Sequence, residues 1–194
     1  MQIKTPLEGA RIRIRDYKNE DLAFVTGLWF DPENGRYMSD PPAGRVDKRY
    51  QKALAEMEDN AGGFYFVIEL AGTGERIGTC CAFPQDESGA FDETHGCYDI
   101  GYCIRKTHWR HGYGEEAVRL LMGWAAARGA REMTAEAAKE NAASCGMLEK
   151  LGFFVLRESS FKKYNTDIVF PSRVYAKMLD GAKENETQRT EAAK

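Results

Sequence analysis

Apolar side chains recur along this chain with two different periods, and the periods predict its strands and helices. From Arg11 to Arg15, charged and aliphatic side chains alternate, which is typical of a strand with one solvated face. Leu22, Val25 and Trp29 follow at helical spacing and form the apolar stripe of a first helix. By the same criteria we expect further strands at residues 64–70, 76–83, 97–104, 132–137, 153–161 and 172–179, and further helices at residues 47–59, 113–128 and 141–151.

The order of these elements predicts an α+β fold with a mixed sheet. One strand and two helices are followed by three strands, a helix, a strand, a helix and two final strands. Because residues 71–74 (Ala-Gly-Thr-Gly) are a hairpin signal between two strands, the sheet is not wholly parallel. We expect a single domain over residues 1–180, with about seven largely antiparallel strands and about four helices. Residues 181–194 have no aromatic or branched aliphatic side chain and are predicted to form a frayed tail.

Composition and charge narrow the possible functions. The 194 residues carry a formal net charge of -3, which argues against a broad nucleic-acid surface, since such a surface needs clustered excess Lys and Arg. No run approaches the roughly 18 apolar residues of a membrane-spanning helix, and the first residues lack the apolar core of a signal peptide. The five cysteines show no Cys-x-x-Cys spacing, so we expect reduced thiols rather than disulfides or metal ligands. These features predict a soluble cytoplasmic protein and leave its oligomeric state open.

The most informative segment runs from Trp109 to Ala117, between a predicted strand and a predicted helix. The first N–H groups of a helix have no intrahelical acceptor, and the helix dipole adds partial positive charge there. Gly112 and Gly114 would let the backbone approach a ligand closely because they have no Cβ. The segment therefore predicts a binding site for a diphosphate group.

Three interpretations of this segment are open from the residues alone. Gly112 to Ala117 matches the dinucleotide fingerprint G-x-G-x-x-G/A, and Glu136 lies near the expected acidic position. Against a dinucleotide, the polar connection at residues 105–111 separates the glycines from the strand, and too few strand–helix units follow. A structural turn that binds no ligand is the second interpretation, and a coenzyme A site is the third.

Three other blocks of the chain accompany the glycine turn: residues 99–102 (Asp-Ile-Gly-Tyr), 140–144 (Glu-Asn-Ala-Ala-Ser) and 148–153 (Leu-Glu-Lys-Leu-Gly-Phe). Together with the turn, they resemble the GNAT superfamily, and more narrowly its RimJ/RimL branch of ribosomal-protein N-terminal acetyltransferases. The opening of that branch is similar to residues 11–16 and Asp21, so the resemblance covers most of the chain from 11 to 179. It implies a GNAT fold whose sheet is splayed at the cofactor strand, with acetyl-CoA as the cofactor.

The resemblance also implies which residues bind coenzyme A. The superfamily turn, (Arg/Gln)-x-x-Gly-x-(Gly/Ala), corresponds to residues 109–114, and Trp109 stands at the position of Arg or Gln. The main-chain amides of the turn would hold the diphosphate, with charge-assisted contacts from Arg110 and His111. The backbone of the cofactor strand and the side chain of Asn141 would face the pantetheine arm. The implied cofactor-binding residues are Tyr102, Cys103, Ile104, Trp109, Arg110, His111, Gly112, Tyr113, Gly114, Glu115, Asn141 and Ser144.

The implied reaction is direct attack of a primary amine on the acetyl thioester, without a covalent enzyme intermediate. The tyrosine acid of many superfamily members would fall seven residues after the asparagine, where this chain has Leu148. Ser144 is therefore the candidate acid that protonates the departing thiolate. Asp99, on the cofactor strand, is the candidate base, with Glu93 and His95 as alternatives.

The acceptor amine is expected to enter between the first two helices and the last hairpin. Tyr37, Asp40, Phe161, Lys163 and Tyr164 are the candidate wall residues there. Protein N-termini and small-molecule amines are both open as acceptors. A non-catalytic acyl-CoA-binding or sensing module of the same fold is the alternative function, and the missing tyrosine keeps it open.

Overall fold

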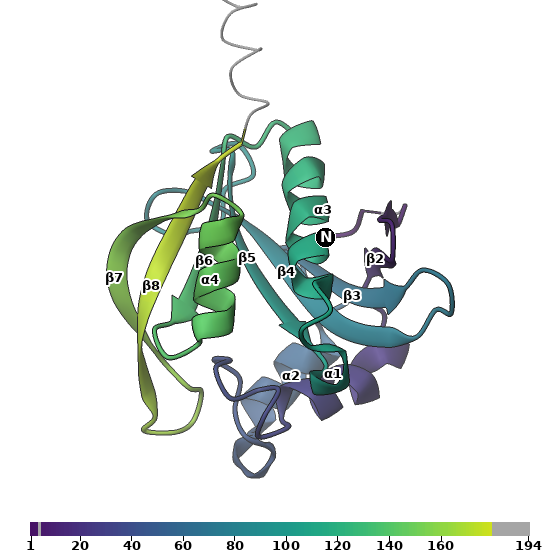
Figure 1. The fold of residues 1–194 in the computed structure, drawn as a ribbon. Coiled ribbons are helices and arrows are strands. Elements are labelled where there is room, and N and C mark those ends of the chain that lie inside the picture. The colour runs from purple at the N-terminus through teal and green to yellow at the C-terminus, as the bar shows by residue number, and fades with distance from the viewer. Residues whose placement is uncertain (4, 180–194) are drawn as a thin grey trace, which may run out of the picture.

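The structure is a computed structural model that describes residues 1–3 and 5–179, and it has one sheet flanked by helices (Figure 1). The strands are β1 (Leu7–Glu8), β2 (Ile12–Asp16), β3 (Phe64–Leu70), β4 (Arg76–Gln85), β5 (Cys97–Ile104), β6 (Glu132–Ala138), β7 (Phe154–Lys162) and β8 (Val169–Met178). The helices are α1 (Leu22–Trp29), α2 (Lys48–Ala55), α3 (Tyr113–Ala127) and α4 (Ala142–Lys150), with short 3-10 turns at η1 (Asn19–Asp21), η2 (Ala43–Arg45) and η3 (Lys106–His108). The predicted tail at 181–194 lies outside the described residues.

The eight strands form one mixed sheet in the order β1-β2-β3-β4-β5-β6-β8-β7, over the part of the chain that the structure describes. Every neighbouring pair is antiparallel except β5 and β6, which run parallel. The predicted α+β class and the largely antiparallel sheet are therefore confirmed. The sheet has one strand more than expected because β1 has only two residues, too few to show an alternating pattern.

The parallel pair diverges partway along β5. Only the first three residues of β5 pair with β6, and the last of these pairs is Asp99 with Thr134. The rest of β5, through Ile104, stays paired with β4 on its other side. One edge of β5 is therefore open from Ile100 onward, which is the splay that the resemblance implied.

Different helices cover the two faces of the sheet. The first face lies against α3 and α4, and its core includes Phe64, Phe66 and Leu121 (Figure 1). On the second face, Val25 of α1 packs with Val67 in a smaller cluster. Successive residues of β3 supply the two clusters in alternation, as the pleat of a strand requires. The side chains of β5 alternate in the same way, so that Tyr98 and Ile100 lie on the α3 side and Asp99 lies on the α1 side.

Three further observations bear on the expectations from sequence. Helix α2 ends at Ala55, four residues earlier than predicted, and begins after Asp47, whose carboxylate accepts from the Tyr50 N–H. No helix in residues 1–3 and 5–179 is long and apolar enough to cross a bilayer. The thiols of all five cysteines are free.

Candidate functional site

The glycine turn presents a row of unpaired main-chain donors. Gly112 is the residue before α3 and has a φ of 79°, a left-handed conformation that glycine adopts without strain. The first hydrogen bond of α3 runs from the Glu116 N–H to the Gly112 carbonyl, at 3.1 Å. Among the described residues, no protein acceptor receives the main-chain N–H groups of residues 110–115. Their number and the helix dipole make this turn suited to bind an anion.

The side chain of Arg11 holds this turn in place. Its Nη1 donates to the His111 carbonyl and its Nε to Glu116 Oε2, both at 2.8 Å. The guanidinium also lies 5.0 Å from the centre of the Tyr113 ring. Arg11 therefore adds positive charge beside Gly112 and fixes the direction of the turn. Sequence reasoning missed this role, because nothing local to Arg11 indicates a partner about one hundred residues away.

Several predicted site residues of the turn already have protein partners. Trp109 Nε1 donates to the Ile104 carbonyl at 2.6 Å, so the last carbonyl of β5 already has a protein partner. The His111 ring stacks on Tyr113 with centroids 5.8 Å apart. The Glu115 carboxylate pairs with two cations, so only its N–H is available to a ligand. The side chains of the turn thus shape it, while its backbone supplies the free donors.

The open edge of β5 exposes the main chain of alternate residues. Just after β5, Arg105 donates its N–H to the Ile77 carbonyl at 2.7 Å. In an antiparallel pair the main-chain groups of successive residues point alternately toward the partner strand and away from it, so this bond sets which residues of β5 face β4. By that alternation the main-chain groups of Tyr102 point away from β4 toward the open edge. Those of Cys103 point toward β4, where its register partner is Thr79. Burial raises the pKa of the Cys103 thiol to about 12, so it stays protonated at neutral pH.

Across the open edge, the start of α4 brings two more predicted residues together. Asn141 is the N-cap of α4, and its side chain accepts from the Ser144 N–H at 3.2 Å. The Ser144 hydroxyl lies 2.6 Å from the Tyr102 hydroxyl, a contact that joins α4 to β5. Leu148, at the position of the expected tyrosine, is fully buried in the core. No phenol from this part of α4 reaches the open edge.

Asp99 lies on the other face of β5, at the point of divergence. Its Oδ1 accepts from Thr134 Oγ1 at 2.8 Å, and the two residues form the last pair between β5 and β6. Burial, opposed by the Thr134 hydrogen bond, raises the pKa of Asp99 to about 6. A carboxylate with this pKa is ionised at neutral pH and is still basic enough to accept a proton.

A second carboxyl with a raised pKa, Asp40, is partly buried on the α1 side of the sheet. The Tyr50 hydroxyl donates to its Oδ1, and burial raises the pKa of Asp40 above its ordinary value. Lys163, from the loop between β7 and β8, donates to the carbonyls of Gly35 and Met38 at 2.7 Å each. The segment between α1 and α2 is thereby fastened to the last hairpin, where the acceptor was expected to enter. Sequence reasoning did not find Tyr50.

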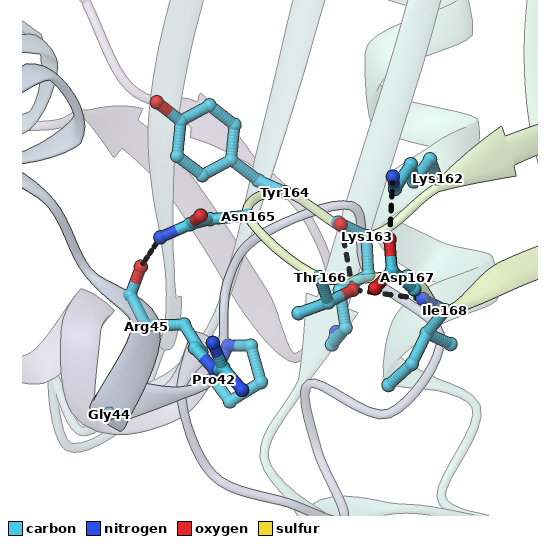
Figure 2. Close-up of a pocket in the computed structure, with 10 residues that line it drawn as sticks. All are labelled: Pro42, Gly44, Arg45, Lys162, Lys163, Tyr164, Asn165, Thr166, Asp167 and Ile168. Atoms are coloured by element: carbon cyan, nitrogen blue, oxygen red, sulfur yellow. Dashed lines mark hydrogen bonds and ion pairs between the residues drawn. The ribbon is translucent and has the colours of Figure 1, made fainter.

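A cavity of about 980 Å³ opens where this hairpin meets η2 (Figure 2). Asn165 Nδ2 donates to the Arg45 carbonyl at 2.7 Å across it. The lining residues are Pro42, Gly44, Arg45, Lys162, Lys163, Tyr164, Asn165, Thr166, Asp167 and Ile168. Of the predicted wall residues, Lys163 and Tyr164 line this cavity. Tyr37 and Phe161 both pack against Phe170 instead, with ring centroids 5.7 and 5.4 Å apart.

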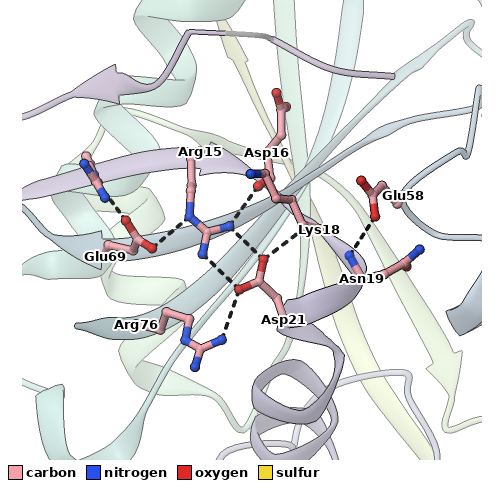
Figure 3. Close-up of polar contacts among 9 residues, drawn as sticks. Arg15, Asp16, Lys18, Asn19, Asp21, Glu58, Glu69 and Arg76 are labelled. Atoms are coloured by element: carbon pink, nitrogen blue, oxygen red, sulfur yellow. Dashed lines mark hydrogen bonds and ion pairs between the residues drawn. The ribbon is translucent and has the colours of Figure 1, made fainter. Parts of the chain in front are cut away.

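A network of charged residues around Asp21 supports the fold beside this site (Figure 3). The Asp21 carboxylate is fully buried and accepts from Arg15 at 2.7 and 2.9 Å and from Arg76 at 3.1 Å. Arg15 Nε donates to Glu69 Oε1 at 2.8 Å. The network joins η1 to β2, β3 and β4, so it fixes the start of α1 on the sheet.

Comparison with known proteins finds a matching family model, a relative in sequence and similar solved structures. The family model described as an acetyltransferase (GNAT) domain matches residues 11–154. The uncharacterized protein YkkB of Bacillus subtilis (strain 168) is 30% identical over 175 residues, which span 89% of this chain and 98% of YkkB. The solved structure of spermidine N-acetyltransferase from Vibrio cholerae, in complex with CoA and spermine, matches with a TM-score of 0.73 at 15% identity, over 90% of this chain and 99% of that one. An acetyltransferase from Salmonella typhimurium that modifies the N-terminal serine of ribosomal protein L7/L12 matches with a TM-score of 0.70 at 14% identity, over 91% of this chain and 100% of that one.

Proposed function

The chain belongs to the acetyltransferase (GNAT) family and has its fold, and we propose that it is an acetyl-CoA-dependent N-acetyltransferase. One observation carries the proposal: three features required for the reaction meet on β5. The turn that follows β5 has unpaired N–H groups at residues 110–115, and the edge of β5 is open from Ile100. Asp99 and Ser144 lie on opposite faces of that strand, so that a base and a hydroxyl donor flank its open edge.

The residues present fit the diphosphate of coenzyme A. The free N–H groups of the turn and the guanidinium of Arg11 would bind it, since both supply hydrogen-bond donors and positive charge. A Cβ on Gly114 would lie 3.4 Å from Met147 Sδ and 3.7 Å from Ile104 Cγ1, so this glycine faces the gap between β5 and α4. The main chain of Tyr102 would pair with an amide of the pantetheine arm, as an added strand pairs with a sheet edge.

The bound co-substrate supplies an activated acetyl thioester, and the side chains of the protein handle the protons. Asp99 would take a proton from the acceptor ammonium on the α1 side of β5, because burial raises its pKa to about 6. Ser144 would donate from the other side to the departing sulfur. The main-chain N–H at the open edge would stabilise the oxyanion that forms during attack.

The acceptor in this proposal is a primary amine, either a protein N-terminus or a small molecule. The similarity to the RimJ/RimL branch favours a ribosomal-protein N-terminus as the first acceptor to test. The single sheet formed by the described residues supports one domain over residues 1–180. Five free thiols and a net charge of -3 fit a cytoplasmic enzyme that does not bind nucleic acid.

The test combines a binding measurement with a turnover measurement. Titration calorimetry with acetyl-CoA should show saturable binding, and a thiol-detecting reagent should show CoA release when ribosomal-protein N-terminal peptides or small amines are added. Binding without thiol release for any amine would support the non-catalytic acyl-CoA-binding module instead. Absence of binding would contradict both functions.

A further inference from the structure

Two hydroxyl groups from distant parts of the chain meet at the open edge of β5. Tyr102 projects from β5, and its phenol oxygen lies 2.6 Å from Ser144 Oγ in the first turn of α4. The backbone of Ser144 is held at the same time, because its N–H donates to Asn141 Oδ1. The Ser144 oxygen is therefore fixed by a contact on its main chain and another on its side chain.

The chemistry of the two hydroxyls sets the direction of their hydrogen bond. Burial raises the pKa of Tyr102 to about 12, so the phenol keeps its proton at neutral pH. Either hydroxyl could donate at this distance, and the arrangement favoured by the greater acidity of a phenol has Tyr102 donating and Ser144 accepting. The Ser144 hydrogen is then free to point at a third atom.

The hydroxyl pair and Asp99 lie on opposite faces of β5. Asp99 and Tyr102 are three residues apart on one strand, so their side chains project from opposite faces. A reacting carbonyl at the open edge would have the base on one side and the Ser144 hydroxyl on the other. This placement would let Asp99 reach the attacking amine while Ser144 reaches the departing sulfur.

We infer that Tyr102 is a positioning residue that orients the Ser144 hydroxyl toward the departing sulfur, an inference that rests on the proposed acetyl transfer. The acceptor ammonium gives one proton to Asp99, and the neutral amine that results forms a bond to the acetyl carbon. The carbon–sulfur bond then breaks, and its electron pair goes to sulfur. Ser144 donates a hydrogen bond to that sulfur, which takes up the second proton lost by nitrogen as the amide forms. In this chain, the phenol that many relatives supply from α4 acts from β5 and through the serine.

Turnover in four variants, compared with a control variant, tests this role. Ser144→Ala and Tyr102→Phe should each lower kcat about tenfold, the effect of losing one oriented hydrogen bond, while KM for acetyl-CoA changes less than twofold. The double variant should be no slower than Ser144→Ala, because Tyr102 acts only through Ser144. Ser144→Thr, which keeps a hydroxyl, should retain most of the activity. Tyr98→Phe is the matched control, since Tyr98 lies on the same strand in the part that pairs with β6, and its hydroxyl accepts from Arg128 Nε at 3.4 Å.

A second measurement does not depend on turnover. The ultraviolet absorbance of the thiolate reports the pKa of the thiol of CoA bound to the protein. A hydrogen bond from Ser144 stabilises the thiolate, so this pKa should be about one unit lower in wild type than in Ser144→Ala or Tyr102→Phe.

The outcomes separate the two proposals. Equal thiol pKa values in all three proteins, or a double variant whose loss is the product of the single losses, would overturn the role of Tyr102. A lowered thiol pKa in a wild type that releases no CoA with any amine would overturn the acetyl transfer and leave the hydroxyl pair supported. A protein that does not bind CoA would overturn both.

Discussion

Replacing Asp99 by asparagine separates the catalytic role proposed for this carboxyl from its effect on stability. The amide has nearly the shape of the carboxylate and keeps an oxygen to accept from Thr134 Oγ1. It removes the charge, which burial disfavours, and puts an NH2 group in place of the other oxygen. The variant should therefore lose acetyl transfer and become more stable than wild type at neutral and alkaline pH.

The pKa of Asp99 gives the size of this gain. Burial raises the pKa from 3.8 to about 6, and each unit corresponds to about 1.4 kcal/mol, which gives roughly 3 kcal/mol. Because the pKa is higher in the folded state, the folded protein binds the proton more tightly than the unfolded chain. Its stabilising contribution is complete below about pH 4 and is lost as the pH rises through 6. The advantage of asparagine should be small at pH 4 and reach roughly 3 kcal/mol at pH 8.

Urea denaturation of both proteins between about pH 4 and pH 8 measures the difference in free energy of unfolding. In wild type, kcat/KM should fall about tenfold per pH unit below the pKa near 6, because only the carboxylate accepts a proton. Asp92 is a useful control: the Thr94 hydroxyl lowers its pKa, so Asp92→Asn should become less stable than wild type as the pH rises. A stability difference for Asp99→Asn that stays constant with pH would refute the reasoning.

The remaining predictions concern the glycine turn and the charged network. Gly112→Val should abolish CoA binding in titration calorimetry, because valine resists a φ of 79°. Gly123→Ala, within α3, is the control: the added Cβ has no atom within 4 Å, so this variant should bind CoA as wild type does. Arg11→Met should weaken CoA binding about tenfold through loss of its charge and its tie to the turn, and unchanged affinity would exclude that role. Asp21→Ala should lower the free energy of unfolding by about 3–5 kcal/mol, since it leaves the partly buried Arg15 without its main partner. Urea denaturation measures this loss, and a loss under about 1 kcal/mol would contradict the prediction.

Local patterns predicted the parts of the molecule that local rules govern. The bounds of β3 and β5 match the expected strands, because both are β-rich; Gly63 and Gly72 flank β3, and Gly96 and the polar connection at residues 105–111 flank β5. The helix expected at residues 141–151 is found as α4, with Asn141 as its N-cap. The partners of Arg11 and Tyr102 were beyond the reach of such rules, since each contact joins elements that only the finished sheet brings together. Similarly, the sequence marked Asp99 as a candidate base, but its burial depends on neighbours from other strands.

The tie between Arg11 and the turn before α3 spans about one hundred residues of chain. Closing so long a loop is entropically costly, and contacts of this separation form after local ones during folding. The helix can form early from its own sequence, whereas the orientation of its first turn depends on Arg11, which comes into place when β2 pairs with β3. Affinity for the phosphates should therefore be acquired late on the folding pathway, after most of the secondary structure has formed.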